Sequence, residues 1–213
     1  EAPKMNNTGI IGENGGDLIE NINENNINVK GKNKTGGLIG NVFKLPGMNN
    51  IYADKISVEG NDYTAGLIGH IENGEGSIIG KIDISNAEVI GNNYTGGVIG
   101  KTFFRDTRRT EFITINDSTI GGKGNYVGGM YGESYNVVKS KATNVKVEGY
   151  GDNIGGISGS SNQNECFIYD SYVKGLGANS NNVGGLFGVM KYASTAFKVV
   201  GTKVSTTGSN VGS

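Results

Sequence analysis

The chain is poor in the residues that most often build disulfide frameworks and metal sites. It has one cysteine, one histidine, two prolines and no tryptophan in 213 residues. A single cysteine, Cys166, excludes an intrachain disulfide framework and a metal site made of several cysteines. A single histidine, His70, excludes the His-Glu-x-x-His zinc site, which needs two histidines one helical turn apart. The composition therefore removes disulfide-stapled modules and zinc-peptidase catalysis by this segment.

Long apolar runs and an excess of one charge are also missing. No run approaches the roughly 20 apolar residues that a membrane-spanning helix needs, so we expect no membrane insertion. The net charge is −1, with acids and bases mixed along the chain, so we expect no nucleic-acid partner. The start, Glu1-Ala-Pro-Lys4, is not a signal peptide. Because residues 210–213 stop inside another copy of the repeat described next, we expect a fragment of a longer protein.

Glycine is abundant, at 38 of 213 residues, whereas average usage is about 7%. The glycines recur in a short phrase, such as Thr35-Gly-Gly-Leu-Ile-Gly40, that is present seven times. Its closing glycines are Gly12, Gly40, Gly69, Gly100, Gly132, Gly159 and Gly188. They are separated by 28, 29, 31, 32, 27 and 29 residues. A period near thirty predicts a repeat architecture in which each unit stacks on its neighbours. We therefore expect a single rod-like domain over residues 1–213.

Strand signals recur at fixed places before each phrase. Residues such as Ile56 and Val58 alternate with polar ones, which indicates a strand with one buried face. A corner precedes that strand, at Asn26, Lys55, Asn86, Asp117, Asn144 and Asp170. Five of these six are Asn or Asp, which tolerate a left-handed backbone. A further apolar run, for example residues 166–169, precedes most corners.

Three short strands per unit and no helical period predict an all-β fold. We expect a right-handed parallel β-helix, or solenoid, with about seven coils of about 29 residues. The hand is that of the commoner form of such coils. Cys166 opens an apolar run, and we expect it to pack in the core as a small hydrophobe.

The phrase itself contributes to the core and to a corner. Its fourth position is always apolar and is expected to point inward. Strand alternation then places the fifth position outward, which gives a candidate exposed apolar stripe at Ile39, Ile68, Ile99, Tyr131 and Phe187. The alternative, which we favour, is that the corner buries these residues too, because monomers rarely expose such a stripe. The glycines are expected to allow close packing or a bend with positive φ.

The phrases resemble the GLUG motif, which is named for its Gly-Leu-hydrophobic-Gly pattern. Residues 37–40, 66–69 and 185–188 match it directly, whereas residues 97–100, 129–132 and 156–159 depart at the leucine. GLUG repeats occur in the N-terminal β-helical regions of Gram-positive zinc metallopeptidases related to the IgA-specific peptidases, and in bacterial adhesins. The resemblance implies a secreted bacterial surface protein, attached to the cell wall through its parent chain.

These observations favour a non-catalytic scaffold or recognition domain that spaces or presents a protease. The expected partner is a host protein or another domain of the same chain, with a glycan as the alternative. We expect no cofactor and no metal, and we expect His70 to be a surface residue. A polysaccharide-cleaving β-helix is the enzyme alternative, and its two carboxylates would be Asp117 and Asp170. Because their corner is otherwise Asn, a ladder of turn residues is favoured there.

A candidate partner-binding segment lies where the repeat spacing is longest. All three arginines, Arg105, Arg108 and Arg109, fall within the 32-residue interval. Arginine is favoured at interface hot spots, so a projecting basic loop could recognise a partner. A solvated loop with no partner is the alternative.

Overall fold

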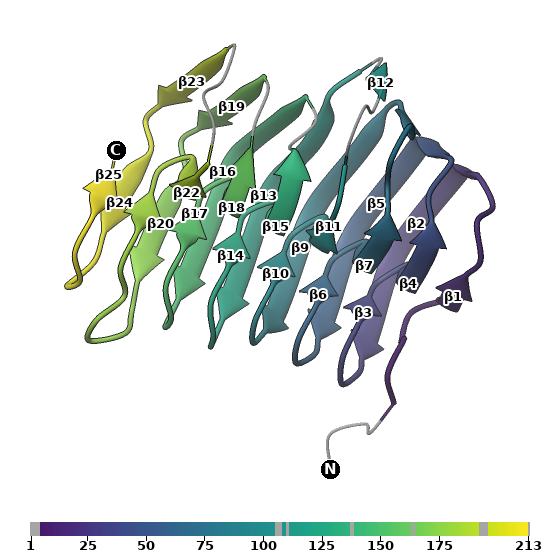
Figure 1. Ribbon diagram of the computed structural model, residues 1–213, viewed down its shortest axis with the longest axis horizontal. Helices are drawn as coiled ribbons and strands as arrows, with labels where there is room; N and C mark the ends of the chain where they lie inside the picture. Colours follow the sequence, from purple (N-terminus) through teal and green to yellow (C-terminus); the bar gives the residue numbers. More distant parts are fainter. Residues whose placement is uncertain are drawn as a thin grey trace.

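The computed structural model describes residues 5–104, 108–109, 111–136, 139–162, 165–191 and 196–212. Within these ranges every regular element is a strand, and the strands pair in parallel into three sheets (Figure 1). The coils stack into a β-solenoid of about six turns, and equivalent residues of successive turns are about 29 residues apart. The two ends of the chain lie at opposite ends of the stack. The prediction of an all-β parallel β-helix is confirmed, and its right hand stays a prediction.

Each coil contributes to all three sheets. Sheet I consists of two-residue strands: β3 (Thr35–Gly36), β6 (Thr64–Ala65), β10 (Thr95–Gly96), β14 (Val127–Gly128), β17 (Ile154–Gly155), β21 (Val183–Gly184) and β25 (Val211–Gly212). Sheet II consists of β1 (Ile11–Asn14), β4 (Ile39–Lys44), β7 (Ile68–Asn73), β11 (Ile99–Thr102), β15 (Tyr131–Asn136), β18 (Ser158–Asn162) and β22 (Phe187–Met190). Sheet III consists of β2 (Ile19–Lys30), β5 (Gly47–Glu59), β8 (Ile78–Ile79), β9 (Ile82–Gly91), β12 (Arg108–Arg109), β13 (Ile113–Gly122), β16 (Ser140–Gly149), β19 (Cys166–Tyr169), β20 (Tyr172–Gly175), β23 (Phe197–Val200) and β24 (Lys203–Ser205).

The long strands of sheet III bend at left-handed residues, at one in β9, β13 and β16 and at two in β2 and β5. In β9, Ile84 points inward, Ser85 and Asn86 do not, and Ala87 points inward again. The φ angle of Asn86 is 51°, so this one residue resets the alternation and turns the chain. The predicted corner residues all have positive φ: Asn26, Lys55, Asn86, Asp117, Asn144 and Asp170. The corner prediction is therefore confirmed.

The phrase does not form one strand, because it bends between sheets I and II. In the third coil, Thr64–Ala65 belongs to β6, Gly66 and Leu67 form the bend, and Ile68 opens β7. Alternation does not continue across a bend, so neighbouring fourth and fifth positions both point inward. The fourth positions are buried, as predicted: Leu38, Leu67, Val98, Met130, Ile157 and Leu186.

The candidate exposed stripe is consequently wrong. Ile39, Ile68, Ile99 and Tyr131 are 0% exposed, and Phe187 in the last turn is partly buried against the core. The favoured alternative, burial at the corner, is what the structure shows for these residues. Cys166 is also fully buried, as expected.

Close packing between coils, and not positive φ, explains the glycines inside the phrase. A Cβ atom on Gly66 would meet the carbonyl oxygen of Gly97 in the next coil, and one on Gly97 would meet that of Gly129, at well under 3.0 Å. Positive φ occurs among the described glycines at Gly16, Gly76 and Gly201, all outside the phrase. The φ half of the prediction is therefore wrong, because stacking 4.8 Å apart is the tighter constraint at this corner.

A ladder of Asn and Asp side chains crosses the turn before sheet I. Its members are Asn33, Asp62, Asn93, Asn125, Asp152 and Asn181. Each side-chain oxygen accepts a hydrogen bond from the backbone N–H of the equivalent residue one coil further on, at 2.7–3.3 Å. This Asn/Asp ladder satisfies backbone donors that the turn leaves outside the sheets.

Candidate functional site

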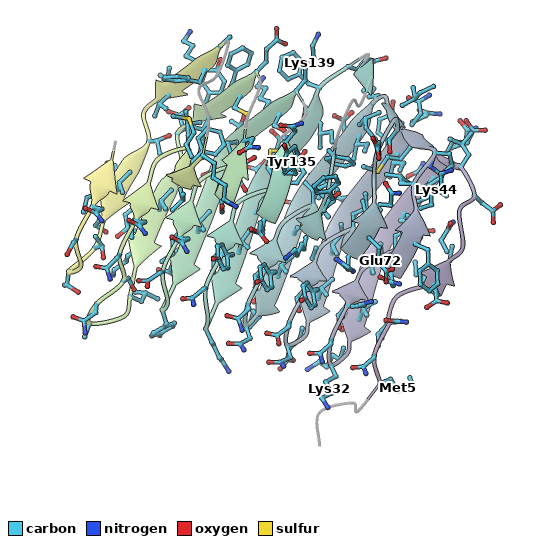
Figure 2. The ribbon with its side chains drawn as sticks, in the orientation of Figure 1. Met5, Lys32, Lys44, Glu72, Tyr135 and Lys139 are labelled. Carbon is cyan, nitrogen blue, oxygen red and sulfur yellow. The ribbon has the colours of Figure 1, made fainter. Side chains whose placement is uncertain are left out.

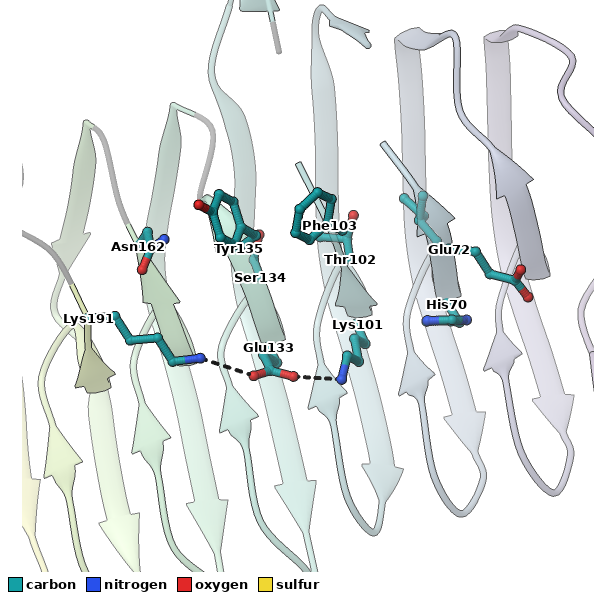
Figure 3. Close-up of a pocket in the computed structure, with 11 residues that line it drawn as sticks. His70, Glu72, Lys101, Thr102, Phe103, Glu133, Ser134, Tyr135, Asn162 and Lys191 are labelled. Atoms are coloured by element: carbon teal, nitrogen blue, oxygen red, sulfur yellow. Dashed lines mark ion pairs between the residues drawn. The ribbon is translucent and has the colours of Figure 1, made fainter. Parts of the chain in front are cut away.

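A groove of about 260 Å³ lies on the outer face of sheet II, where the strands continue past the closing glycines (Figure 3). Its residues come from β7, β11, β15 and β18 and from the positions that follow β11 and β22. Glu72 and Tyr135, which both line it, are visible on the same face of the solenoid in Figure 2. The pairing of Lys101 with His70 and with Glu133 fixes the rows of side chains across the coils. Parallel in-register strands thus place equivalent residues of successive coils side by side.

The lower row of the groove in Figure 3 is an ion-pair row that spans four coils, from β11 to the residue after β22. Lys101 Nζ lies 2.8 Å from Glu133 Oε2, and Lys191 Nζ lies 3.5 Å from Glu133 Oε1. Burial lowers the pKa of Lys101, but the hydrogen bond and the charge of Glu133 outweigh burial, so this pKa lies above its ordinary value. The row therefore presents donors and acceptors in alternation with charges of both signs.

A polar network holds the N-terminal end of the groove. Glu72 Oε1 accepts hydrogen bonds from Lys34 Nζ at 3.0 Å and from Asn41 Nδ2 at 3.1 Å. Asn41 Oδ1 lies 3.2 Å from His70 Nδ1, which is the donor in this pair. The hydrogen bond from Lys34 holds the pKa of Glu72 below its usual range. Burial, and then the charge of Lys34, lower the pKa of His70 to about 4, so His70 is neutral at pH 7.

The upper row contains an aromatic ledge formed by Phe103 and Tyr135 from adjacent coils. Their ring centroids are 4.6 Å apart with a 37° tilt. Phe103 is 40% exposed and Tyr135 is 43% exposed. Large aromatic rings that line a groove while remaining this exposed are available to contact a ligand.

A tyrosine ladder lies beside the ion-pair row. Tyr63, Tyr94 and Tyr126 stack with centroid distances of 4.9 and 5.0 Å and interplanar angles of 3° and 2°. Lys101 Nζ sits 4.5 Å from the centroid of Tyr94, and the ring of Tyr63 lies 5.0 Å from that of His70. All three tyrosines have positive φ, of 56–63°, which is a strained conformation for a bulky residue. Other coils carry Asn at this position, including Asn153, Asn182 and Asn210.

Two residues that line the groove each carry a buried polar atom without a hydrogen-bond partner in the part of the chain that the structure describes. These atoms are the hydroxyl oxygen of Thr102 and the amide oxygen Oδ1 of Asn162. Thr102 is 3% exposed and Asn162 is 7% exposed. An unsatisfied buried polar group costs about 1–3 kcal/mol, so its presence in a groove is an observation that requires a reason.

The structure describes only part of the segment that carries Arg105, Arg108 and Arg109. Arg108 and Arg109 form β12, whose backbone pairs in parallel with Ile78 and Ile79 of β8 at the edge of sheet III. Arg105, and the side chains of Arg108 and Arg109, lie outside the described residues. Their role in partner binding stays a prediction.

The two aspartates of the enzyme alternative lie at the left-handed corner of sheet III and do not line the groove on sheet II. Asp117 Oδ1 accepts a hydrogen bond from Asn144 Nδ2 at 2.6 Å, which is a contact between successive corners. Asp170 lies at the same corner one coil beyond Asn144. This arrangement agrees with the ladder of turn residues that the sequence favoured over a catalytic pair of carboxylates.

Sequence analysis missed most of the groove, although it named His70. Most of the lining side chains occupy the first and third positions after each closing glycine, as in Lys101 and Phe103 or Glu133 and Tyr135. Extending the strand alternation two or three residues beyond the phrase would have marked these positions as outward. Their chemistry differs from coil to coil, so they leave no recurring pattern in the sequence.

Comparisons with known proteins leave the family open. No protein-family model, no curated protein and no solved structure matches the chain. Among the residues that the structure describes, no group of three or more His, Cys, Asp or Glu side chains could hold a metal ion. A search of the same residues found no helix long and apolar enough to cross a bilayer.

Proposed function

We propose that this chain is a non-catalytic recognition scaffold within a secreted bacterial surface protein. It is a solenoid that displays a binding groove. The observation that carries the proposal is that five neighbouring coils supply the walls of the groove. In-register pairing fixes the spacing of those coils, so the groove is pre-organised and binding costs little conformational entropy. A repeat fold that presents an extended surface in this way suits recognition of an elongated ligand.

The charges of the groove support binding more than hydrolysis. Glycoside hydrolysis by two carboxyl groups needs one whose pKa is raised so that it can donate a proton. The groove contains Glu72 and Glu133. The pKa of Glu72 is lowered by Lys34, and Glu133 is ion-paired with two lysines. The lowered pKa of Glu72 does not favour a protonated acid at neutral pH.

The placement in a surface protein rests on the GLUG resemblance. In the first form of the proposal, the chain is the N-terminal region of a zinc metallopeptidase related to the IgA-specific peptidases, and it spaces or presents the protease and contacts a host protein. In the second form, the chain is the rod of a wall-attached adhesin that itself binds a host protein or a glycan. The groove favours the second form, because a spacer alone does not need it.

Two measurements test the proposal. On intact cells that make the full-length protein, an antibody against this chain should bind as well as it does on permeabilised cells; binding only after permeabilisation contradicts surface display. The purified chain should release no new reducing ends from polysaccharides. Release that disappears in Asp117→Asn, Asp170→Asn or Glu133→Gln would show that the chain is an enzyme instead.

The arginine segment has its own test. Changing Arg105, Arg108 and Arg109 together to Ser should weaken binding to a host protein if that segment contacts it. Unchanged binding removes the segment from the proposal and leaves the groove in place.

A further inference from the structure

From the chemistry of the groove, we infer that it binds an uncharged polysaccharide that lies along the solenoid axis, with its sugar rings on the aromatic ledge of Phe103 and Tyr135. This inference rests on the recognition role proposed above and names its ligand class.

The aromatic ledge fits the flat face of a pyranose ring. One face of such a ring carries several C–H bonds and is apolar, whereas its edge carries hydroxyl groups. Phe103 and Tyr135 line the groove, leave about two-fifths of their surface exposed to solvent, and follow one another along the axis. A ring placed on them would bury apolar surface of both partners, and a linear chain of rings could follow the coils, which repeat about every 4.8 Å.

The edges of the ligand must then meet polar groups of mixed type. Glu133 accepts hydrogen bonds, and Lys101 and Lys191 donate them. The orphan oxygen of Asn162 needs a donor, whereas the side chain of Thr102, in register with the core residue Ile71, faces the interior of the solenoid. A sugar hydroxyl is both a donor and an acceptor, so it is the ligand group that can satisfy this whole set.

The charges of the groove disfavour polyanions as its ligand. Lys101 and Lys191 both pair with Glu133, Glu72 pairs with Lys34 at the N-terminal end, and His70 is neutral at pH 7, so three lysines meet two carboxylates. A sulfated glycan or a nucleic acid would place its charges against the two carboxylates with a surplus of only one lysine to bind them. An uncharged ligand avoids this conflict.

The backbone of the groove argues against an extended peptide. Peptides that add to a sheet pair with unpaired main-chain groups at an edge strand. The groove lies on the face of sheet II, and the backbones of β11 and β15 are already paired on both sides with neighbouring coils. A peptide would therefore lack the main-chain contacts that give this mode its affinity.

Isothermal titration of the purified chain tests the inference with defined probes. The probes are the uncharged hexasaccharides of β-1,4-glucan, β-1,3-glucan, α-1,4-glucan, xylan and chitin, with a heparin hexasaccharide and a polyglutamate peptide as charged comparators. We expect at least one uncharged probe to bind with a Kd of about 1 mM or tighter. Its affinity should change by less than about twofold between low and high salt, because no ion pair with the ligand is involved.

Groove variants then locate the site. The double variant Phe103→Ala/Tyr135→Ala should weaken that binding at least about tenfold, as expected when stacking on two aromatic rings is lost. Asn162→Ala should weaken it by about threefold or more. Phe43→Ala is the matched control: Phe43 is 45% exposed on β4 of the same sheet but does not line the groove, so its removal should leave the affinity unchanged.

Three outcomes overturn the inference: no uncharged probe binds, a charged comparator binds while the uncharged probes do not, or the double variant keeps the affinity of the parent chain. The two replaced rings are exposed, so each variant should melt at the parent temperature, and the single variants replace the double one if it does not. Surface display is measured on cells and not by titration. A failure here leaves the proposed function standing, and a failure of surface display leaves the titration result standing.

Discussion

The two sides of sheet II differ in how much they repeat. On the inner side, the phrase places the same chemistry in successive coils, with glycines against carbonyl oxygens and a fully buried fifth residue such as Ile68 or Ile99. On the outer side, equivalent positions change from His70 to Lys101 to Glu133. The inner side must satisfy the same packing in every coil, whereas the outer side is free to differ. In this solenoid, the repeated residues stabilise the fold, and the residues that differ between coils indicate what it can bind.

The largest effect should come from a side chain added at the inner corner. Gly97→Val places a Cβ against the carbonyl oxygen of Gly129, which no rotamer can relieve, so we expect a loss of more than about 4 kcal/mol in unfolding free energy. Gly121→Val is the matched control, because a Cβ there would approach nothing closer than Val89 O at 3.9 Å. Urea denaturation measures both. Equal midpoints for the two variants would remove close packing as the reason for the phrase.

The burial of the fifth position gives the next largest effect. Ile99→Ala should lower the unfolding free energy by about 2–5 kcal/mol, the usual cost of truncating a buried isoleucine. Ile90→Ala, at a position that is 42% exposed in β9, should change it by less than about 1 kcal/mol. Thermal or urea denaturation measures the loss of stability in both variants. A loss below about 1 kcal/mol for Ile99→Ala would indicate that the fifth positions are exposed, as in the candidate apolar stripe.

The pH dependence of stability should report the burial of His70. Its pKa is about 4 in the folded chain and 6.5 when unfolded, so between these values the unfolded state binds more protons. Stability contributed by neutral His70 is therefore lost as the pH falls from 6.5 towards 4. We expect a difference of about 1 kcal/mol between the parent and His70→Gln over this range, since partial exposure screens the shift. Parallel pH profiles for the two proteins would contradict it.

The smallest effect should follow from replacing a ladder tyrosine by the residue that other coils use there. Tyr94→Asn removes two ring contacts, worth about 0.5–1.5 kcal/mol each, and relieves a left-handed strain of about 1–2 kcal/mol. The two terms oppose one another, so the unfolding free energy should change by less than about 1 kcal/mol. A loss above 2 kcal/mol by the same denaturation measurement would make the tyrosines part of the repeated framework, since stacking would then exceed the strain by about that amount.

The framework was predictable because its causes are local and recur. The spacing of the glycines gave the coil, and the Asn and Asp residues gave the left-handed corner of sheet III. The burial of Ile39 and Ile99 does not follow from strand alternation, because the bend at the second glycine of the phrase interrupts the strand. The Asn/Asp ladder from Asn33 to Asn181 was also missed, since it depends on one side chain reaching the next coil.

The groove was not predicted from the sequence for a different reason. Lys101, Glu133 and Lys191 are 32 and 58 residues apart in sequence, and only the register of the coils brings them together. Differences between coils carry no signal unless that register is known. The arginine segment attracted the prediction because it interrupts the repeat visibly, whereas the groove uses positions that leave the repeat intact.

The in-register stacking has one more consequence, which concerns how such a rod can change in length. A segment of one full period, inserted or removed anywhere along the stack, leaves every glycine facing a carbonyl and every ladder oxygen facing an N–H. Each such step alters the length by about 4.8 Å. Duplicating the coil that carries Lys101 and Phe103 would extend the groove by one more set of side chains. Reach and binding length would therefore change together, in whole coils.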